Sequence, residues 1–245
     1  MPLQSHEWRS RFYQFALLPR MKKMQAVEKL LTHIWEGHNL AALLEEFMFE
    51  TKLAVHENLN SYFHDNGFDK IVLFQDDETK MKMRLHIWYP MLIPGQRRPR
   101  QNVHNHRWDF SSIVLTGQAT NLIYRMACEG ENGEELYHYR YYARGSKEHY
   151  EVELLGKSQV VTETVERHEA GKLYSIDNEI LHRVDIDDNA TVATLVVTHE
   201  NVSWVTNDLL SEKSMGTSKA RLPSPAMTND IIVDKVKNLR EHMRI

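Results

Sequence analysis

The first part of the chain carries apolar residues at helical spacing. Two such groups lie on either side of Gly37, a residue type that often ends a helix, and Asn39 can cap the start of the second group. The groups are Leu30, Leu31 and Ile34, and then Leu40, Leu43, Leu44, Phe47 and Met48. The pattern predicts two helices in an N-terminal helical extension, residues 1–67, packed on the domain that follows.

The pattern changes at Asn66 and Gly67, a pair typical of a turn. Beyond it, short alternating or apolar runs rich in Val, Ile, Tyr and Thr are separated by turn residues, as expected for β-strands. The predicted strands are Lys70–Phe74, Met83–Tyr89, Ser112–Leu115, Asn121–Met126, Glu135–Arg144, Gln159–Val165, Lys172–Ile176 and Thr191–Thr198. Many short strands at regular spacing indicate a mainly β barrel or sandwich over residues 68–204.

After Trp204 the chain turns polar as far as Pro225, which predicts a linker arm within a last segment, residues 205–245. A short helix is expected to start near Thr228 or Asn229. It carries one apolar stripe, formed by Ile232, Val236, Leu239 and Met243. The stripe predicts a face of the helix that docks either on the barrel or on a second subunit. A homodimer is therefore one of the two alternatives.

Composition narrows the class of protein. The formal net charge is −4 and no long Lys/Arg run occurs, so the electrostatic footprint of a nucleic-acid partner is missing. No apolar stretch approaches the ~18 residues of a membrane helix, and the N-terminus has no apolar signal segment. The single cysteine, Cys128, cannot form an intrachain disulfide and lies in an acidic turn. We therefore expect a cytoplasmic protein without a catalytic thiol.

The candidate chemistry lies in three of the 14 histidines. His104 and His106 are two residues apart in a segment expected to be a strand, so both side chains would project from one face. A third ligand must come from a distant strand, and His182 follows a turn and opens such a strand. We predict that His104, His106 and His182 bind one divalent metal ion. Taken alone, the histidine pair could also be an exposed pair, so the prediction depends on the surrounding order of features.

That order is a strand with the histidine pair, an apolar run ending at Gly117, a long excursion, Gly171, a strand and the third histidine. It resembles the cupin superfamily over about residues 68–202. The resemblance implies a single-domain cupin, a double-stranded β-helix or jelly-roll barrel, with N-terminal helices and a C-terminal arm added.

Among cupins, the chain looks most like thiol dioxygenases of the cysteine dioxygenase type. Strand Met83–Tyr89 is similar to that family's tryptophan-containing strand, and Ile180–Val184 is similar to the segment around its third histidine. The usual cupin glutamate is missing, and Phe110 and Ser111 stand at its two places. The resemblance implies three neutral histidines on Fe(II), with positions left for a substrate and O₂.

The chain also departs from that family. The cysteine and tyrosine that cross-link there correspond to Ser111 and His199, and a histidine of the first motif corresponds to Phe110. The arginine that binds the substrate carboxylate has no clear counterpart, and Lys70 is the nearest basic residue. The metal site therefore carries over, the clamp for a thiol amino acid does not, and cysteine is not the predicted substrate.

The resemblance places His86 and Trp88 facing inward, with His199 across the metal from them. A histidine near a metal can act as a general acid or base near neutral pH, so His86 and His199 are the catalytic candidates. The alternatives stay open, namely barrel core for the aromatic residues and a hydrogen-bonded strand end for His199. The predicted substrate pocket consists of Trp88, Trp108, Phe110, Ser111 and Lys70.

Three functions follow, in order of preference. The first is a non-haem Fe(II)- and O₂-dependent oxygenase acting on a small organic substrate. The second is a redox-silent, zinc-type cupin that catalyses a condensation, isomerisation or rearrangement. The third is a cupin that binds a ligand without catalysis. Fe(II) is the expected metal, with Zn, Ni or Mn as alternatives. Motifs of serine hydrolases, phosphate loops and dinucleotide-binding folds are absent from the sequence.

Overall fold

The computed structural model describes residues 10–11, 14–15, 17–36, 39–54, 60–76, 78–93, 96–142, 149–199, 206–216 and 219–245, so Gly37 lies outside the described residues. The helices are α2 (Arg20–Trp35), α3 (Asn39–Leu53) and α4 (Asn229–Met243). The strands are β1 (Tyr62–His64), β2 (Phe68–Gln75), β3 (Lys82–Trp88), β4 (Val103–His104), β5 (Phe110–Thr116), β6 (Gln118–Met126), β7 (Glu134–Tyr142), β8 (His149–Glu169), β9 (Leu173–Ile176), β10 (Leu181–Ile186), β11 (Val192–Thr198), β12 (Thr206–Ser211) and β13 (Lys219–Pro223).

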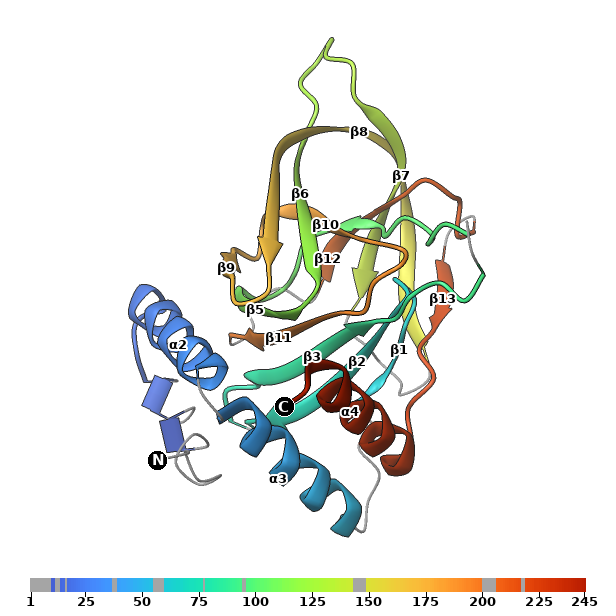
Figure 1. Ribbon diagram of the computed structural model, residues 1–245. Helices are drawn as coiled ribbons and strands as arrows, with labels where there is room; N and C mark the ends of the chain where they lie inside the picture. Colours follow the sequence, from blue (N-terminus) through green and yellow to red (C-terminus); the bar gives the residue numbers. More distant parts are fainter. Residues whose placement is uncertain are drawn as a thin grey trace.

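These strands form two antiparallel sheets (Figure 1). One has six strands in the order β1-β2-β3-β11-β5-β9, and the other has seven in the order β13-β8-β6-β10-β4-β12-β7. From β3 onward the chain passes repeatedly between the sheets, so that β3-β11-β5-β9 lies over β4-β10-β6-β8, and β11 returns to pair with β3. This is the double-sheet jelly-roll arrangement. The predicted mainly β, single-domain jelly-roll fold is confirmed.

Strand β3 illustrates how the sequence builds the two faces of the six-stranded sheet. Alternate residues of a strand point to opposite faces. Leu85 and Ile87 are fully buried and pack toward the helices, whereas Arg84, His86 and Trp88 point into the space between the sheets. Both faces of this sheet are therefore covered, one by helices and one by the second sheet.

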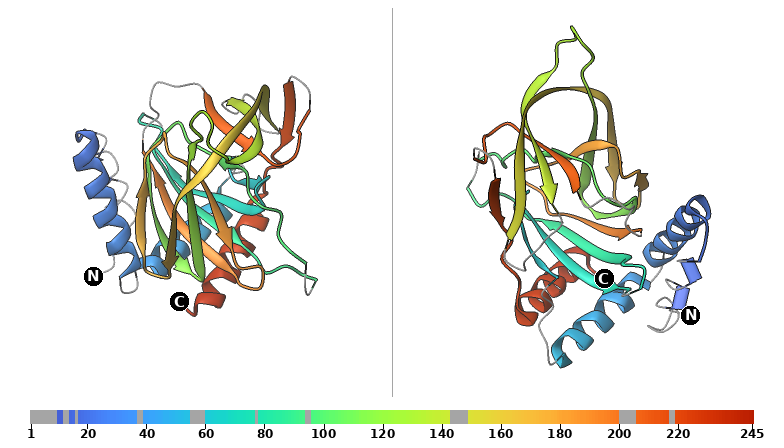
Figure 2. Two further views of the ribbon diagram at one scale, coloured as in Figure 1. Left: turned by 90° about the horizontal axis from the view of Figure 1, so that it is seen from above. Right: turned by 180° about the vertical axis from the view of Figure 1, so that it is seen from behind.

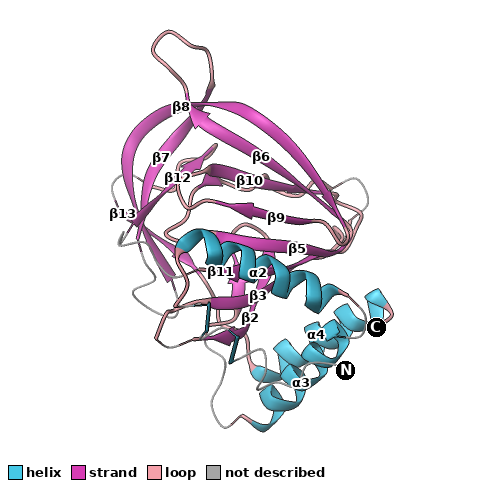
Figure 3. Cartoon of the chain, turned by 90° about the vertical axis from the view of Figure 1, so that its left-hand side faces the viewer, coloured by secondary structure: helices cyan, strands magenta, loops and turns pink. Residues whose placement is uncertain are grey.

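The helices gather on the outer face of the six-stranded sheet, as Figure 3 shows. Apolar residues of α2, α3 and α4 share one hydrophobic cluster with β2, β3, β5 and β11. Thr228 caps α4 by accepting a hydrogen bond from the backbone N–H of Ile231, which confirms the predicted start of this helix. Its predicted stripe is also confirmed as a docking face, because Ile232, Val236 and Leu239 are buried in the shared cluster.

The sheets extend beyond the segment predicted for the barrel. Strand β1 lies within the stretch assigned to the helical extension, and its Tyr62 and His64 pair with β2. The segment expected to be a linker arm contributes β12 and β13 to the seven-stranded sheet. In the two views of Figure 2, both strands run alongside the sheet. The C-terminal part of the chain is thus integral to the barrel.

One turn between the sheets requires glycine. Gly117 joins β5 to β6 with a φ of 73°, a conformation that side chains disfavour. A Cβ there would lie 2.7 Å from the Cγ2 of Val192 and 2.8 Å from the carbonyl oxygen of Thr191. The close approach explains why the apolar run ends at this residue. Within the described residues, no helix combines the length and apolar character needed to span a membrane.

Candidate metal centre

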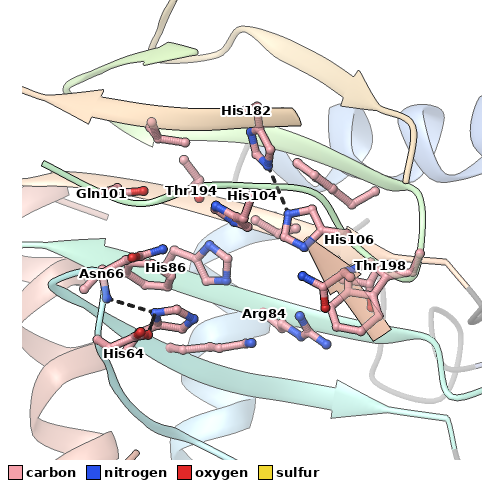
Figure 4. A pocket seen from close by; sticks show the side chains of 18 of the residues that line it. His64, Asn66, Arg84, His86, Gln101, His104, His106, His182, Thr194 and Thr198 are labelled. Carbon is pink, nitrogen blue, oxygen red and sulfur yellow. Dashed lines mark hydrogen bonds and ion pairs between the residues drawn. The ribbon is translucent and has the colours of Figure 1, made fainter. Parts of the chain in front are cut away.

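Three histidines converge in the space between the sheets (Figure 4). His104 ends β4 and lies directly opposite His182 of β10 in the strand register. His106 lies just beyond β4, where its backbone N–H donates to the carbonyl oxygen of Asn178 at 3.0 Å. The ring centroids are 4.8, 4.9 and 5.1 Å apart, and one nitrogen of each ring lies within 4.8 Å of the others. The two neighbouring histidines therefore converge as expected, although only His104 belongs to a strand.

The ring nitrogens are arranged as a metal site requires. His104 Nδ1 donates to the carbonyl oxygen of Asn102 at 2.9 Å, which leaves the Nε2 lone pair for a cation. The Nε2 atoms of His106 and His182 lie 3.0 Å apart. Two nitrogen ligands at right angles around one ion, with bonds of about 2.1 Å, are also about 3.0 Å apart. The spacing suits one shared ion.

Burial keeps these histidines neutral. It lowers the pKa of His104 to about 4, and it lowers the pKa values of His106 and His182 well below the ordinary value for histidine. Neighbouring histidines add to the effect at His106 and His182, because a second positive charge nearby is unfavourable. Near neutral pH each ring can therefore offer a lone pair.

The donor set fits a divalent metal ion. Among the described residues the group consists of histidines alone, without a carboxylate ligand. Three protein ligands leave coordination positions for small molecules, which is the pattern of catalytic rather than structural metal sites. The fit agrees with the prediction that the usual cupin glutamate is replaced.

The histidines open onto a cavity of about 120 Å³. Aromatic and polar side chains share its wall. Of the residues predicted for the pocket, Lys70, Trp88, Trp108 and Phe110 line it, and so does the catalytic candidate His86. Phe110 contacts the ring of His106 edge to face at 5.2 Å, and Trp108 stacks on the same ring at 5.7 Å. A cavity below the range of about 300–1,000 Å³ found for drug-sized ligands suits a small substrate.

One strand presents three unsatisfied polar atoms to this cavity. Arg84 Nε, His86 Nε2 and Trp88 Nε1 are buried and have no hydrogen-bond partner among the described residues. Buried polar groups are normally satisfied, so a row of three needs an explanation. Arginine and indole N–H groups only donate, so the row calls for a ligand with acceptor atoms.

Arg84 was missed in the sequence, although the signal was there. The alternation that turns His86 and Trp88 inward applies equally to position 84. Its side chain is 5% exposed overall, and its guanidinium lies 5.1 Å from the centroid of Trp108. Burial lowers the pKa of Arg84 to about 10, still high enough to keep the charge at neutral pH. The electrostatic influences on it come from Tyr62, Tyr150 and Arg107, and none is a carboxylate.

A tyrosine pair completes the wall next to Lys70. The hydroxyls of Tyr62 and Tyr150 are hydrogen-bonded to each other, and Lys70 Nζ donates to Tyr62 at 2.8 Å. Tyr141 packs on the ring of Tyr150 at 5.0 Å. The sequence carried no local signal for this pair, because β1 and the first residues of β8 meet only in the folded chain.

Two predicted residues are not brought to the cavity. Ser111 is fully buried on the opposite face of β5, where its hydroxyl bonds that of Ser175 at 2.8 Å. His199 follows β11, whose Thr194, Val196 and Thr198 face the cavity, and its backbone N–H donates to the carbonyl oxygen of Asp109. Neither residue is among those that line the cavity, and Ser111 lies on the face of β5 turned away from it.

Comparison with known proteins yields structural likeness only. No protein-family model and no curated protein matches the chain. A hydroquinone 1,2-dioxygenase from Sphingomonas sp. TTNP3 with 4-hydroxybenzoate bound is 8% identical over 54% of this chain and 66% of its own, with a TM-score of 0.33. A cupin-like protein from Thermotoga maritima is 12% identical over 67% and 81%, with a TM-score of 0.29.

An oxalate oxidase is 14% identical over 80% of this chain and 81% of its own, with a TM-score of 0.32. The chain spans 47%, 64% and 66% of the first three solved structures that it matches. At such values the likeness says nothing about chemistry. The strand order of the two sheets defines the fold of this chain.

Proposed function

We propose that the protein is a metal-dependent enzyme, an Fe(II)- and O₂-dependent oxygenase of a small, anionic organic substrate. The observation that carries the proposal is a group of three neutral histidines beside a strand with three unsatisfied polar atoms. His104, His106 and His182 would hold the ion. Bound Fe(II) would supply O₂ chemistry, and neutral ligands leave its double positive charge uncompensated. Zn, Ni or Mn would fit the same nitrogen donors.

The substrate class follows from the charges along the cavity. Arg84 brings a buried positive charge and Lys70 an ammonium group to the cavity wall, while Asp65, an acidic residue that also lines it, is paired with His64 at 2.8 Å. Arg84 Nε and Trp88 Nε1 can donate to one carboxylate or other oxyanion. The aromatic side chains of Trp88, Trp108 and Phe110 would pack against the apolar part of the substrate and exclude water.

The protein's own residues would orient the substrate and handle protons. Arg84 would fix the anionic end, so that the rest of the molecule points toward the histidine group. His86 has a pKa well below the ordinary value because it is buried, and its Nε2 can accept a proton or a hydrogen bond from the substrate. We assign the proton-transfer role to His86, since His86 lines the cavity and His199 is not among its lining residues.

A redox-silent, zinc-type enzyme is the alternative, and one observation favours it. Buried cations beside a Lewis-acid metal would also stabilise an enolate or other oxyanion during an isomerisation or condensation. This reaction type would need the same histidines and the same Arg84, but no O₂.

Oxygen consumption distinguishes the two reactions. The protein is loaded with Fe(II) under argon and then mixed with air-saturated buffer and a panel of small carboxylates, phenols and hydroxy acids. It should consume O₂ with at least one of these compounds. His104→Ala should remove this consumption, whereas Lys237→Ala, on the exposed face of α4, should retain it. Stoichiometric zinc in native protein, with full turnover of a substrate under argon, would contradict the oxygenase and support the alternative.

A further inference from the structure

The segment that carries the first two metal ligands has little secondary structure of its own. Strand β4 comprises only Val103 and His104, and His106 lies outside it. A strand of two residues makes few backbone hydrogen bonds, so the position of its side chains depends on the segments that flank it. It lies between β10 and β12, with His104 opposite His182 on one side and opposite Leu209 on the other.

Asn105, between the two ligands, is clamped by β12. Its Nδ2 donates to Asp208 Oδ2 at 3.0 Å, and its Oδ1 accepts from the backbone N–H of Asp208 at 2.6 Å. Its own backbone N–H donates to the carbonyl oxygen of Asp208 at 3.3 Å, and its carbonyl oxygen accepts from Asn207 Nδ2 at 2.8 Å. Four hydrogen bonds therefore hold this one residue, which is 6% exposed, to β12.

A second hydrogen bond fixes the Asp208 carboxylate on the side away from Asn105. His138 Nε2, on β7, donates to Asp208 Oδ1 at 2.9 Å, and His138 Nδ1 lies 3.0 Å from the hydroxyl of Ser158 on β8. One carboxylate oxygen thus accepts a hydrogen bond from Asn105, and the other accepts one from His138. The chain of contacts runs from β8 through β7 and β12 to the residue between the ligands.

The other side of the segment has a separate support. The carbonyl oxygen of Asn178 accepts from the backbone N–H of His106, while the backbone N–H of Asn178 donates to Asp109 Oδ1 at 2.9 Å. Arg20 of α2 binds both oxygens of Asp109, at 2.6 and 2.7 Å. Helix α2 therefore supports His106, and β12 supports the Asn105 side.

From this geometry we infer that Asp208 is a positioning residue for the metal centre, acting through Asn105 on the backbone that carries His104 and His106. The inference rests on the proposed metal-binding function and gives the C-terminal segment a role in it. Groups one contact removed from metal ligands commonly contribute 10–100-fold to metal affinity. Asp208 does not touch the cavity, so its effect would reach the metal only through the ligand backbone.

Cobalt binding to the full chain tests the inference. Asp208→Asn removes the charge and replaces one of the two acceptor oxygens by an NH₂ donor, so the bonds to Asn105 and His138 are both kept only if His138 changes tautomer and accepts at Nε2. We expect Co²⁺ to bind 10–100-fold more weakly than to wild type and its visible absorption bands to shift. Asn105→Ala should weaken binding at least as much, and His138→Gln, one contact further away, should weaken it less.

Asp185→Asn is the matched control. Asp185 is also a carboxylate on the outer surface, paired with Arg183 at 3.4 Å, and it lies on the strand that carries His182. Within the part of the chain that the structure describes, Asp185 makes no hydrogen bond to Asn105. The Co²⁺ affinity of Asp185→Asn should therefore stay within about twofold of wild type, and its visible spectrum should be unchanged.

The cobalt spectrum separates positioning from loss of stability, because a folded but destabilised protein keeps its ligand geometry. Urea unfolding of the metal-free variants shows which of them are folded. A folded Asp208→Asn and a folded Asn105→Ala with wild-type Co²⁺ affinity and spectrum would overturn the inference alone. A wild-type chain that takes up no Co²⁺ would overturn the proposed function, and this inference with it.

Discussion

At the scale of single residues, the most unusual group is a buried arginine beside three neutral histidines. A buried charge without a carboxylate partner opposes folding, and proteins keep such groups where function requires them. Arg84 lies on the strand that also carries His86 and Trp88, and all three have unsatisfied polar atoms. The buried charge lowers the stability of the ligand-free protein, and the same charge favours binding of an anion.

Replacement of Arg84 should therefore separate stability from function. Arg84→Met keeps the length of the side chain and removes the buried charge, so the free energy of unfolding should rise by about 1 kcal/mol or more. Binding of anionic substrate should weaken at least tenfold. Urea unfolding and ligand titration measure the two effects. A variant that is markedly less stable, yet binds an anionic substrate normally, would contradict this role for Arg84.

The same burial predicts how stability changes with pH. The pKa of His104 is about 4 in the folded chain, and those of His86, His106 and His182 are also well below the ordinary 6.5. Below pH 6.5 these histidines become protonated in the unfolded chain but stay neutral in the folded chain. Stability is therefore present above pH 6.5 and is lost as pH falls toward 4, by up to about 1.4 kcal/mol per pH unit for each histidine.

Urea unfolding of metal-free protein at pH 7, 6 and 5 measures this loss. His86→Phe removes one of these groups and should make the dependence on pH less steep by about one histidine. A free energy of unfolding that is constant over this range would show that these rings are protonated as readily in the folded chain as in the unfolded one.

At the scale of elements, strand parity explains which site residues were predictable. The alternation of β3 turns His86 and Trp88 inward, and the same alternation identifies Arg84. On β5 the rule that directs Phe110 into the cavity sends Ser111 to the other face. Ser111 and His199, which the family resemblance placed beside the metal, are not among the residues that line the cavity.

Other elements could not be read from local sequence. Strands β4, β12 and β13 are short and have no clear alternation, because pairing with distant strands creates them. The neighbours of β4 come from positions about 80 and 100 residues later, and no local pattern encodes them. Helix α4, in contrast, has a capping threonine and an apolar stripe, both of which act locally.

Helix α4 allows a test at this scale. Val236 is fully buried in the cluster shared with α3 and the six-stranded sheet, so Val236→Asp should lower the free energy of unfolding by about 3 kcal/mol or more. Lys237→Ala, on the exposed face, should change it by no more than about 0.5 kcal/mol. Equal effects of the two changes in urea unfolding would argue against docking of α4 on this core.

At the scale of the whole molecule, the layers explain why the metal centre lies where it does. Helices seal the outer face of the six-stranded sheet, and the second sheet covers its inner face, so polar side chains between the sheets are withdrawn from water (Figure 3). The histidines come from segments about 80 residues apart, and only the closed jelly roll brings them together. Metal binding and formation of the barrel should therefore be coupled.

The most direct test of the central claim is the metal content of the native protein. Elemental analysis of protein purified without added metal, beside His104→Ala and His182→Ala, counts the ions in each chain. Wild type should carry about one divalent ion per chain, and both folded variants should carry essentially none. A wild type without metal, or variants that retain the full amount, would contradict a metal centre at His104, His106 and His182.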